Sequence, residues 1–117
     1  MNTPVYDFLI QYAERDPVRL HMPGHKGRFG APALQRATAL DLTEITGADS
    51  LFEAEGILAE SERNAASLYG TAYTFYSCGG STLCIQTMLL LMKQQGRAVL
   101  AARNVHRAFL NTLSLIH

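Results

Sequence analysis

The chain has 117 residues, 48% of them hydrophobic, with 10 basic and 10 acidic side chains and a pI near 6.9. This composition is typical of one globular unit, or of part of one, and excludes a disordered or fibrous protein. Electrical neutrality without a basic run disfavours nucleic acid as a partner.

The amino terminus, residues 1–7, lacks the charged region and cleavage site of a secretory signal. The longest apolar stretch, residues 83–92, is far shorter than the roughly 20 residues of a membrane span. We therefore expect a cytoplasmic protein with no membrane partner. Cys78 and Cys84 lack the spacing of zinc or redox sites, so we expect no metal site and two reduced, packed cysteines.

The amino-terminal half of the chain is expected to be helix and loop. Apolar residues at helical spacing predict a helix over residues 5–15. One proline and three glycines make residues 20–30 a loop that is rich in hydrogen-bond donors. A short helix is expected over residues 32–39, and residues 41–56 show no sustained period, which indicates irregular structure.

The second half of the chain alternates between helix and strand patterns. The predicted elements are a helix over 57–69 that Gly70 caps, a strand over 72–77, a helix over 81–95, a strand over 98–101, and a helix that starts near 104–106. Strand, glycine turn, helix and strand in this order are typical of a βαβ unit, so the sequence predicts an α/β fold.

This interpretation divides the chain into an amino-terminal helix and loop arm, residues 1–56, and the start of a larger domain, residues 57–117. A parallel sheet needs more than two strands and a helical layer on both faces, so we expect the domain to be incomplete. Apolar side chains surround nearly the whole helix 81–95. Further chain or a partner subunit is expected to cover them.

The segment Ser-Cys-Gly-Gly-Ser-Thr, residues 77–82, joins the first predicted strand to a helix. Free backbone N–H groups at a helix N-terminus, beside glycines and two hydroxyls, suit a phosphate. Alternatively, Ser81 only caps the helix and the glycines only form a turn. The segment matches neither the P-loop nor the dinucleotide-binding pattern, which disfavours a nucleoside triphosphate or NAD.

Two other segments contain candidate site residues. His106 follows the strand predicted over residues 98–101, and ligands of open α/β sheets lie at the carboxyl ends of strands. An imidazole there can stack on an aromatic cofactor ring, and the alternative is an ordinary surface histidine. His25 and Lys26, on the glycine-rich loop, are candidates for a substrate or subunit contact.

Together, four segments in order resemble the Orn/Lys/Arg decarboxylase family, pyridoxal 5'-phosphate (PLP) enzymes of the aspartate-aminotransferase fold, or fold type I. The segments are HMPGHKG at 21–27, DLTEITGAD at 41–49, GGST at 79–82 and RNVHR at 103–107. The resemblance implies that the PLP-binding large domain begins within this chain. It also implies that His25 and Lys26 lie near the active-site entrance and the subunit interface.

The resemblance further implies the roles of individual residues at the cofactor. Gly80, Ser81 and Thr82 match the turn that binds the PLP phosphate, and His106 matches the histidine that stacks on the pyridine ring. The sequence departs from the family at Gly79, where asparagine is common, and at the residues flanking His106.

The implied activity is decarboxylation of a basic amino acid, whether arginine, lysine or ornithine, by a dimer or larger homo-oligomer. In this family the lysine that binds PLP covalently lies beyond residue 117, and Lys26 and Lys93 lack its context. We therefore expect this chain alone to be inactive and to supply cofactor contacts only. Alternatives are a non-catalytic remnant or interaction module, another fold type I enzyme such as an aminotransferase or aldolase, and a phosphate-binding domain unrelated to PLP.

Overall fold

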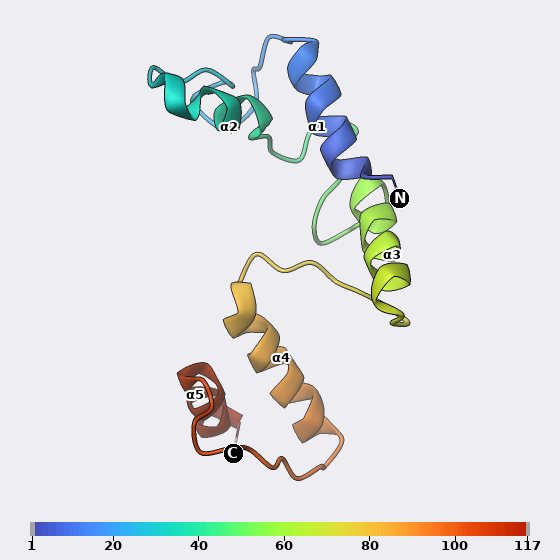
Figure 1. Cartoon of the computed structure of the whole chain (residues 1–117), viewed down its shortest axis with the longest axis vertical. Coiled ribbons are helices and arrows are strands. Elements are labelled where there is room, and N and C mark those ends of the chain that lie inside the picture. The colour runs from blue at the N-terminus through green and yellow to red at the C-terminus, as the bar shows by residue number, and fades with distance from the viewer. Residues whose placement is uncertain (1, 117) are drawn as a thin grey trace. The chain divides into compact units, whose positions relative to one another are not determined.

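The structure, a computed structural model, describes residues 2–116 and contains helices but no β-strand in that range (Figure 1). The elements are α1 (Pro4–Glu14), the 3₁₀ turn η1 (Pro32–Leu34), α2 (Gln35–Leu40), α3 (Ile57–Tyr69), α4 (Gly80–Gln94) and α5 (Arg107–Ile116). The chain divides between Tyr76 and Ser77 into two compact units. The expected boundary between arm and large domain at residues 56 and 57 stays a prediction.

All of the predicted helices form close to their expected ends. Gly70 ends α3 in the left-handed conformation, with φ +65°, which confirms the predicted cap. In the first unit α1 packs against both α2 and α3. The segment between α2 and α3 is irregular, as expected.

The predicted α/β fold is wrong for this chain. Residues 72–77 and 98–101, predicted as strands, form no ladder with any segment among the described residues. Aromatic and β-branched residues favour strands, but only backbone hydrogen bonds to a neighbouring strand make a sheet. Without such a neighbour, the side chains of Tyr73 and Phe75 are nearly four-fifths exposed and Leu100 is fully exposed.

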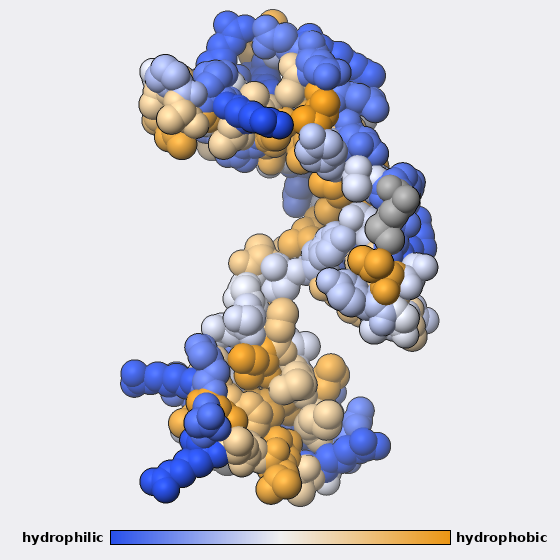
Figure 2. Space-filling model, in the orientation of Figure 1, coloured by the Kyte–Doolittle hydropathy of each residue, from blue (hydrophilic) through white to orange (hydrophobic). Residues whose placement is uncertain are grey.

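The second unit has a small core between α4 and α5, which pack against each other. Its buried residues are Leu89 on α4 and Ala108 and Thr112 on α5. Most other apolar side chains of this unit are exposed, and Figure 2 shows a broad hydrophobic surface where α4 and α5 lie in Figure 1. Cover by a partner or by further chain therefore stays a prediction.

Two smaller expectations concern the cysteines and the membrane. Cys78 and Cys84 are free, as expected, but both are exposed, so the prediction that they pack is wrong. Between residues 2 and 116, no helix has the length and apolar character needed to cross a membrane.

Candidate functional site

The predicted phosphate turn forms the N-terminus of α4. Gly79 is the N-cap residue, α4 begins at Gly80, and no side chain caps the helix. Ser81 is therefore not the cap, contrary to the simpler interpretation of this segment. The Gly79 N–H donates to the Ser77 hydroxyl oxygen over 3.1 Å.

The same turn is open at Gly80, whose φ is +63° and whose absent Cβ would meet no atom within 4 Å. The first-turn amides of a helix have no partner inside the helix and carry the positive end of its dipole. Together with the exposed hydroxyls of Ser81 and Thr82, these amides fit a phosphate group. A Cβ at Gly79, by contrast, would lie 2.6 Å from the Cβ of Leu83, so a larger residue there requires that side chain to move.

His106 lies immediately before α5 and caps its first turn. The imidazole Nδ1 accepts a hydrogen bond from the Ala108 N–H over 3.2 Å, and the His106 carbonyl accepts one from the Phe109 N–H over 2.9 Å. Because Nδ1 is an acceptor, the neutral ring carries its proton on Nε2. The residue is exposed. Within residues 2–116 no hydrogen bond or ring contact joins His106 to residues 80–82, so their meeting at one cofactor stays a prediction.

In the first unit, Arg19 precedes the loop of residues 20–30 and is a buried charged residue. Only 8% of Arg19 is exposed. Its guanidinium donates to three carbonyl oxygens at the C-terminal end of α2, those of Thr38, Ala39 and Asp41, at 2.6–3.5 Å. It also lies 5.0 Å from the centre of the Tyr12 ring. Arg19 therefore satisfies carbonyls that the end of α2 leaves unpaired.

The two candidate residues of this loop, His25 and Lys26, are held by contacts within the chain. The His25 Nε2 donates to a carboxylate oxygen of Asp41 over 3.1 Å, while its Nδ1 accepts from the Gly27 N–H over 3.1 Å. The Lys26 ammonium donates to the carbonyl of His21. Both nitrogens of His25 are thus engaged, whereas the Lys26 ammonium has two further N–H donors to offer.

Asp49 holds the loop that leads into α3. Its carboxylate accepts four backbone N–H groups, from Ser50, Glu55, Gly56 and Leu58, at 2.9–3.2 Å. Burial of this carboxyl group raises its pKa, but the four hydrogen bonds outweigh that effect and leave the pKa of Asp49 below its usual 3.8. The carboxylate supplies the cap that Gly56 lacks at the start of α3.

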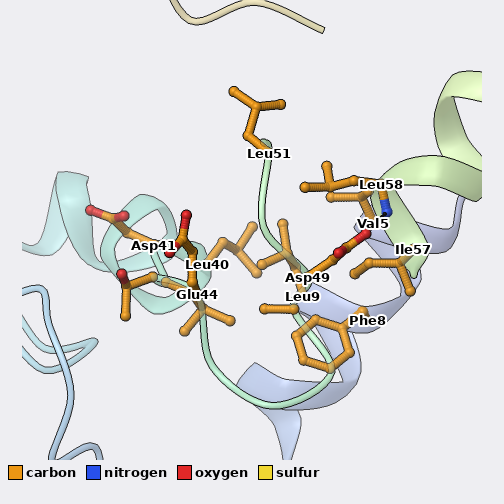
Figure 3. Close-up of a pocket in the computed structure, with 13 residues that line it drawn as sticks. Val5, Phe8, Leu9, Leu40, Asp41, Glu44, Asp49, Leu51, Ile57 and Leu58 are labelled. Carbon is orange, nitrogen blue, oxygen red and sulfur yellow. Dashed lines mark hydrogen bonds between the residues drawn. The ribbon is translucent and has the colours of Figure 1, made fainter. Parts of the chain in front are cut away.

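An open groove of about 600 Å³ lies between α1, the segment after α2 and the start of α3 (Figure 3). Its floor is largely apolar and includes Phe8, Leu9 and Leu40, which Figure 3 shows in sticks. No group of three or more His, Cys, Asp or Glu side chains suited to a metal ion occurs in the described part of the chain.

Sequence reasoning missed the groove and the roles of Arg19 and Asp49. Asp49 caps a helix that begins eight positions later, at Ile57, so it matches no local capping pattern. Arg19 precedes the residues whose carbonyls it caps by 19 to 22 positions. Both contacts depend on how the chain folds back on itself, and no local sequence signal indicates them.

Comparison with known proteins shows which class this chain belongs to. A model of the Orn/Lys/Arg decarboxylase major domain matches residues 3–116. Arginine decarboxylase from Bacillus cereus is 32% identical over 95% of this chain, which covers 25% of that enzyme. Arginine decarboxylase from Bacillus subtilis is 32% identical over 95% of the chain and 24% of the enzyme. Lysine decarboxylase LdcA from Pseudomonas aeruginosa is 25% identical over 94% of the chain and 16% of the enzyme.

The proteins named in these matches are amino-acid decarboxylases. The chain belongs to the Orn/Lys/Arg decarboxylase family, as its four motifs predict. It spans about a quarter of the length of the arginine decarboxylases that it matches. No solved structure matches the chain.

Proposed function

We propose that this chain forms part of the PLP site of a decarboxylase that acts on a basic amino acid. Family membership supports decarboxylation, and the names of its relatives favour arginine or lysine as substrate. The observation that carries the proposal is the uncapped N-terminus of α4, where open backbone amides and two hydroxyls fit a phosphate. A cytoplasmic homo-oligomer is part of the same proposal.

In this proposal Gly80, Ser81 and Thr82 hold the cofactor phosphate. The amides of the first turn donate to its oxygens, and the helix dipole favours its negative charge. Gly80 lets the phosphate approach the main chain, because the space where a Cβ would lie is open. The hydroxyls of Ser81 and Thr82 add two neutral donors.

His106 orients the cofactor ring in this proposal. Its hydrogen bond from the Ala108 N–H restrains the ring, and its exposure leaves a face available for stacking. Bound PLP supplies an electron sink for the charge that remains when the α-carboxylate leaves as CO2. The residues of this chain bind and orient the cofactor, while the covalent lysine is proposed to lie outside the chain.

A binding experiment tests the cofactor site apart from activity. We expect the 117-residue chain to bind PLP more tightly than pyridoxal, which lacks the phosphate, in a titration followed by cofactor fluorescence. The double change Ser81→Ala and Thr82→Val should reduce this difference. His106→Ala should weaken both ligands about equally, because stacking does not involve the phosphate. Equal affinity of the unchanged chain for PLP and pyridoxal would contradict the proposed phosphate site.

The activity is tested in the protein as it is expressed from its own gene. We expect CO2 release from arginine, lysine or ornithine that depends on added PLP. Release from none of the three, in protein that binds PLP, would favour another fold type I reaction. The same protein with His106→Ala should retain its fold but bind PLP less tightly.

A further inference from the structure

A separate, polar pocket of about 420 Å³ lies in the first unit between the end of α1, the loop of residues 26–28 and α2. Three cationic side chains line it, those of Arg19, Lys26 and Arg28, together with one acid, Asp16. The volume is within the range of small-molecule sites. The lining carries two more positive charges than negative ones.

The loop is built to bring these cations together. Gly27 is buried with φ +77°, and a Cβ there would lie 2.5 Å from the guanidinium carbon of Arg19. Only glycine therefore allows the main chain between Lys26 and Arg28 to pack directly on the buried arginine. This close approach sets the two neighbouring cations beside Arg19.

The three cations differ in how much bonding capacity they have left. Arg19 uses its guanidinium on the carbonyls at the end of α2, so it contributes a fixed positive charge. Among the described residues, Lys26 makes one hydrogen bond, to the His21 carbonyl, and has three donors. In the same range Arg28 makes one, to Asp16 over 3.0 Å, and has five donors.

The bond between Arg28 and Asp16 is weak and easily exchanged. Both side chains are about three-quarters exposed, and ion pairs of this kind contribute little to stability. Asp16 therefore pairs with the Arg28 guanidinium without fixing its position. A bound anion can take the place of this carboxylate.

We propose that this pocket binds the phosphate group of a small metabolite, held by Lys26 and Arg28 in the field of Arg19. A phosphate monoester carries nearly two negative charges on one compact group, which matches the charge excess of the pocket. Arginine and lysine are the side chains that proteins use for such groups. This site lies in the first unit and does not depend on the function proposed for the α4 turn.

The test is a titration of the 117-residue chain with inorganic phosphate at constant ionic strength, followed by the backbone amide signals in NMR spectra. We expect saturable shifts at residues 26–28. Arg28→Gln should weaken binding by about tenfold, the effect of losing one charged hydrogen bond. Asp16→Asn should strengthen binding several-fold, because it removes the internal competitor. Arg36→Gln, which changes an exposed arginine outside the pocket, should have no effect.

Controls separate this site from the α4 turn and from other anions. Ser81→Ala with Thr82→Val should leave the shifts at residues 26–28 unchanged. Succinate, a dicarboxylate with two negative charges, should bind at least tenfold more weakly than phosphate. Three results would each overturn the proposal. They are shifts that saturate only at residues 80–82, a phosphate affinity of Arg28→Gln equal to that of the unchanged chain, and tighter binding of succinate than of phosphate. The first of these results would leave the proposed PLP site intact.

Discussion

At the scale of single residues, Arg19 and Asp49 stabilise the first unit by satisfying backbone groups that helix ends leave unpaired. Arg19 donates to carbonyls at the end of α2, and Asp49 accepts amides at the start of α3. Each side chain caps its helix from a distant position in the sequence. Removal of either side chain should therefore loosen a helix end that has no cap from a neighbouring residue.

Arg19→Lys is expected to destabilise the first unit. A lysine ammonium cannot reproduce the planar fork that reaches the carbonyls of Thr38, Ala39 and Asp41, so we expect a loss of at least about 2 kcal/mol. Arg36→Lys, on the exposed face of α2, should change stability by less than about 0.5 kcal/mol. Urea unfolding followed by circular dichroism measures both. Equal stability of the two variants would show that the capping by Arg19 contributes nothing.

The pH dependence of stability should include a contribution from Asp49. Since the pKa in the folded chain lies below the usual 3.8, the carboxylate stabilises the fold fully above that pH. The stabilisation is lost as the pH falls through the lower folded-state pKa. Asp49→Asn should lower the melting temperature near neutral pH and flatten the acid limb of the curve of melting temperature against pH. Glu53→Gln, in the same loop, should leave that limb unchanged, and a steep limb in Asp49→Asn would contradict the assignment.

At the scale of elements, α4 and α5 form the second unit through one narrow contact. Leu89 is 1% exposed, and Thr112 on α5 is equally buried, its hydroxyl donating to the Ala108 carbonyl over 2.7 Å. Two apolar helices thus bury only a small part of their surface against each other. The position of each leucine on α4 decides what it contributes.

Leu89→Ala should therefore cost more than the same change at Leu91. We expect the fully buried Leu89 to contribute about 2–5 kcal/mol, the usual range for such core positions, and the half-exposed Leu91 to contribute well under that. Thermal unfolding of the two variants measures the difference. Similar losses at both positions would mean that the α4–α5 contact uses another face of α4.

Residues 72–75 and 98–101, which were expected to be strands, allow a prediction about hydrogen exchange of their backbone amides. Their backbone amides are in no ladder, so we expect them to exchange with solvent as fast as those of an unfolded peptide. Amides in the centre of α4 should exchange more slowly. Native-state hydrogen exchange read by NMR distinguishes the two groups, and protection in the two segments would reveal pairing.

At the scale of the whole molecule, the apolar surface is large for a chain of this size. Side chains at least 38% exposed include Leu83, Met88, Leu90, Leu91 and Leu113 in the second unit alone. Contiguous exposed apolar patches mark surfaces that bind other protein. The chain spans about a quarter of the length of the arginine decarboxylases that it matches.

We therefore expect the 117-residue chain to associate with itself in a concentration-dependent way. Leu91→Glu, which places a charge on the exposed face of α4, should shift the equilibrium toward monomer without unfolding the helix. Sedimentation velocity across a range of concentrations measures this, with Leu68→Glu, at an exposed position on α3 in the first unit, as the comparison. A monomer at all concentrations would show that the exposed leucines alone do not drive association.

Local pattern determined much of this protein. Helical spacing and the cap at Gly70 predicted the helices, because helix formation depends on contacts between residues three and four apart. The four motifs identified the decarboxylase family in the same way, since a motif is a short run of neighbouring residues. The predicted roles of Gly80, Ser81, Thr82 and His106 stay predictions.

Only the tertiary structure decided the rest. The apolar pattern of residues 72–77 and 98–101 predicted strands, but a strand requires a partner and none pairs with them among residues 2–116. The caps made by Arg19 and Asp49, and the pocket of Arg19, Lys26 and Arg28, arise because loops bring distant side chains and backbone groups together. Neighbouring residues in the sequence specify periodicity, whereas such contacts depend on the path of the folded chain.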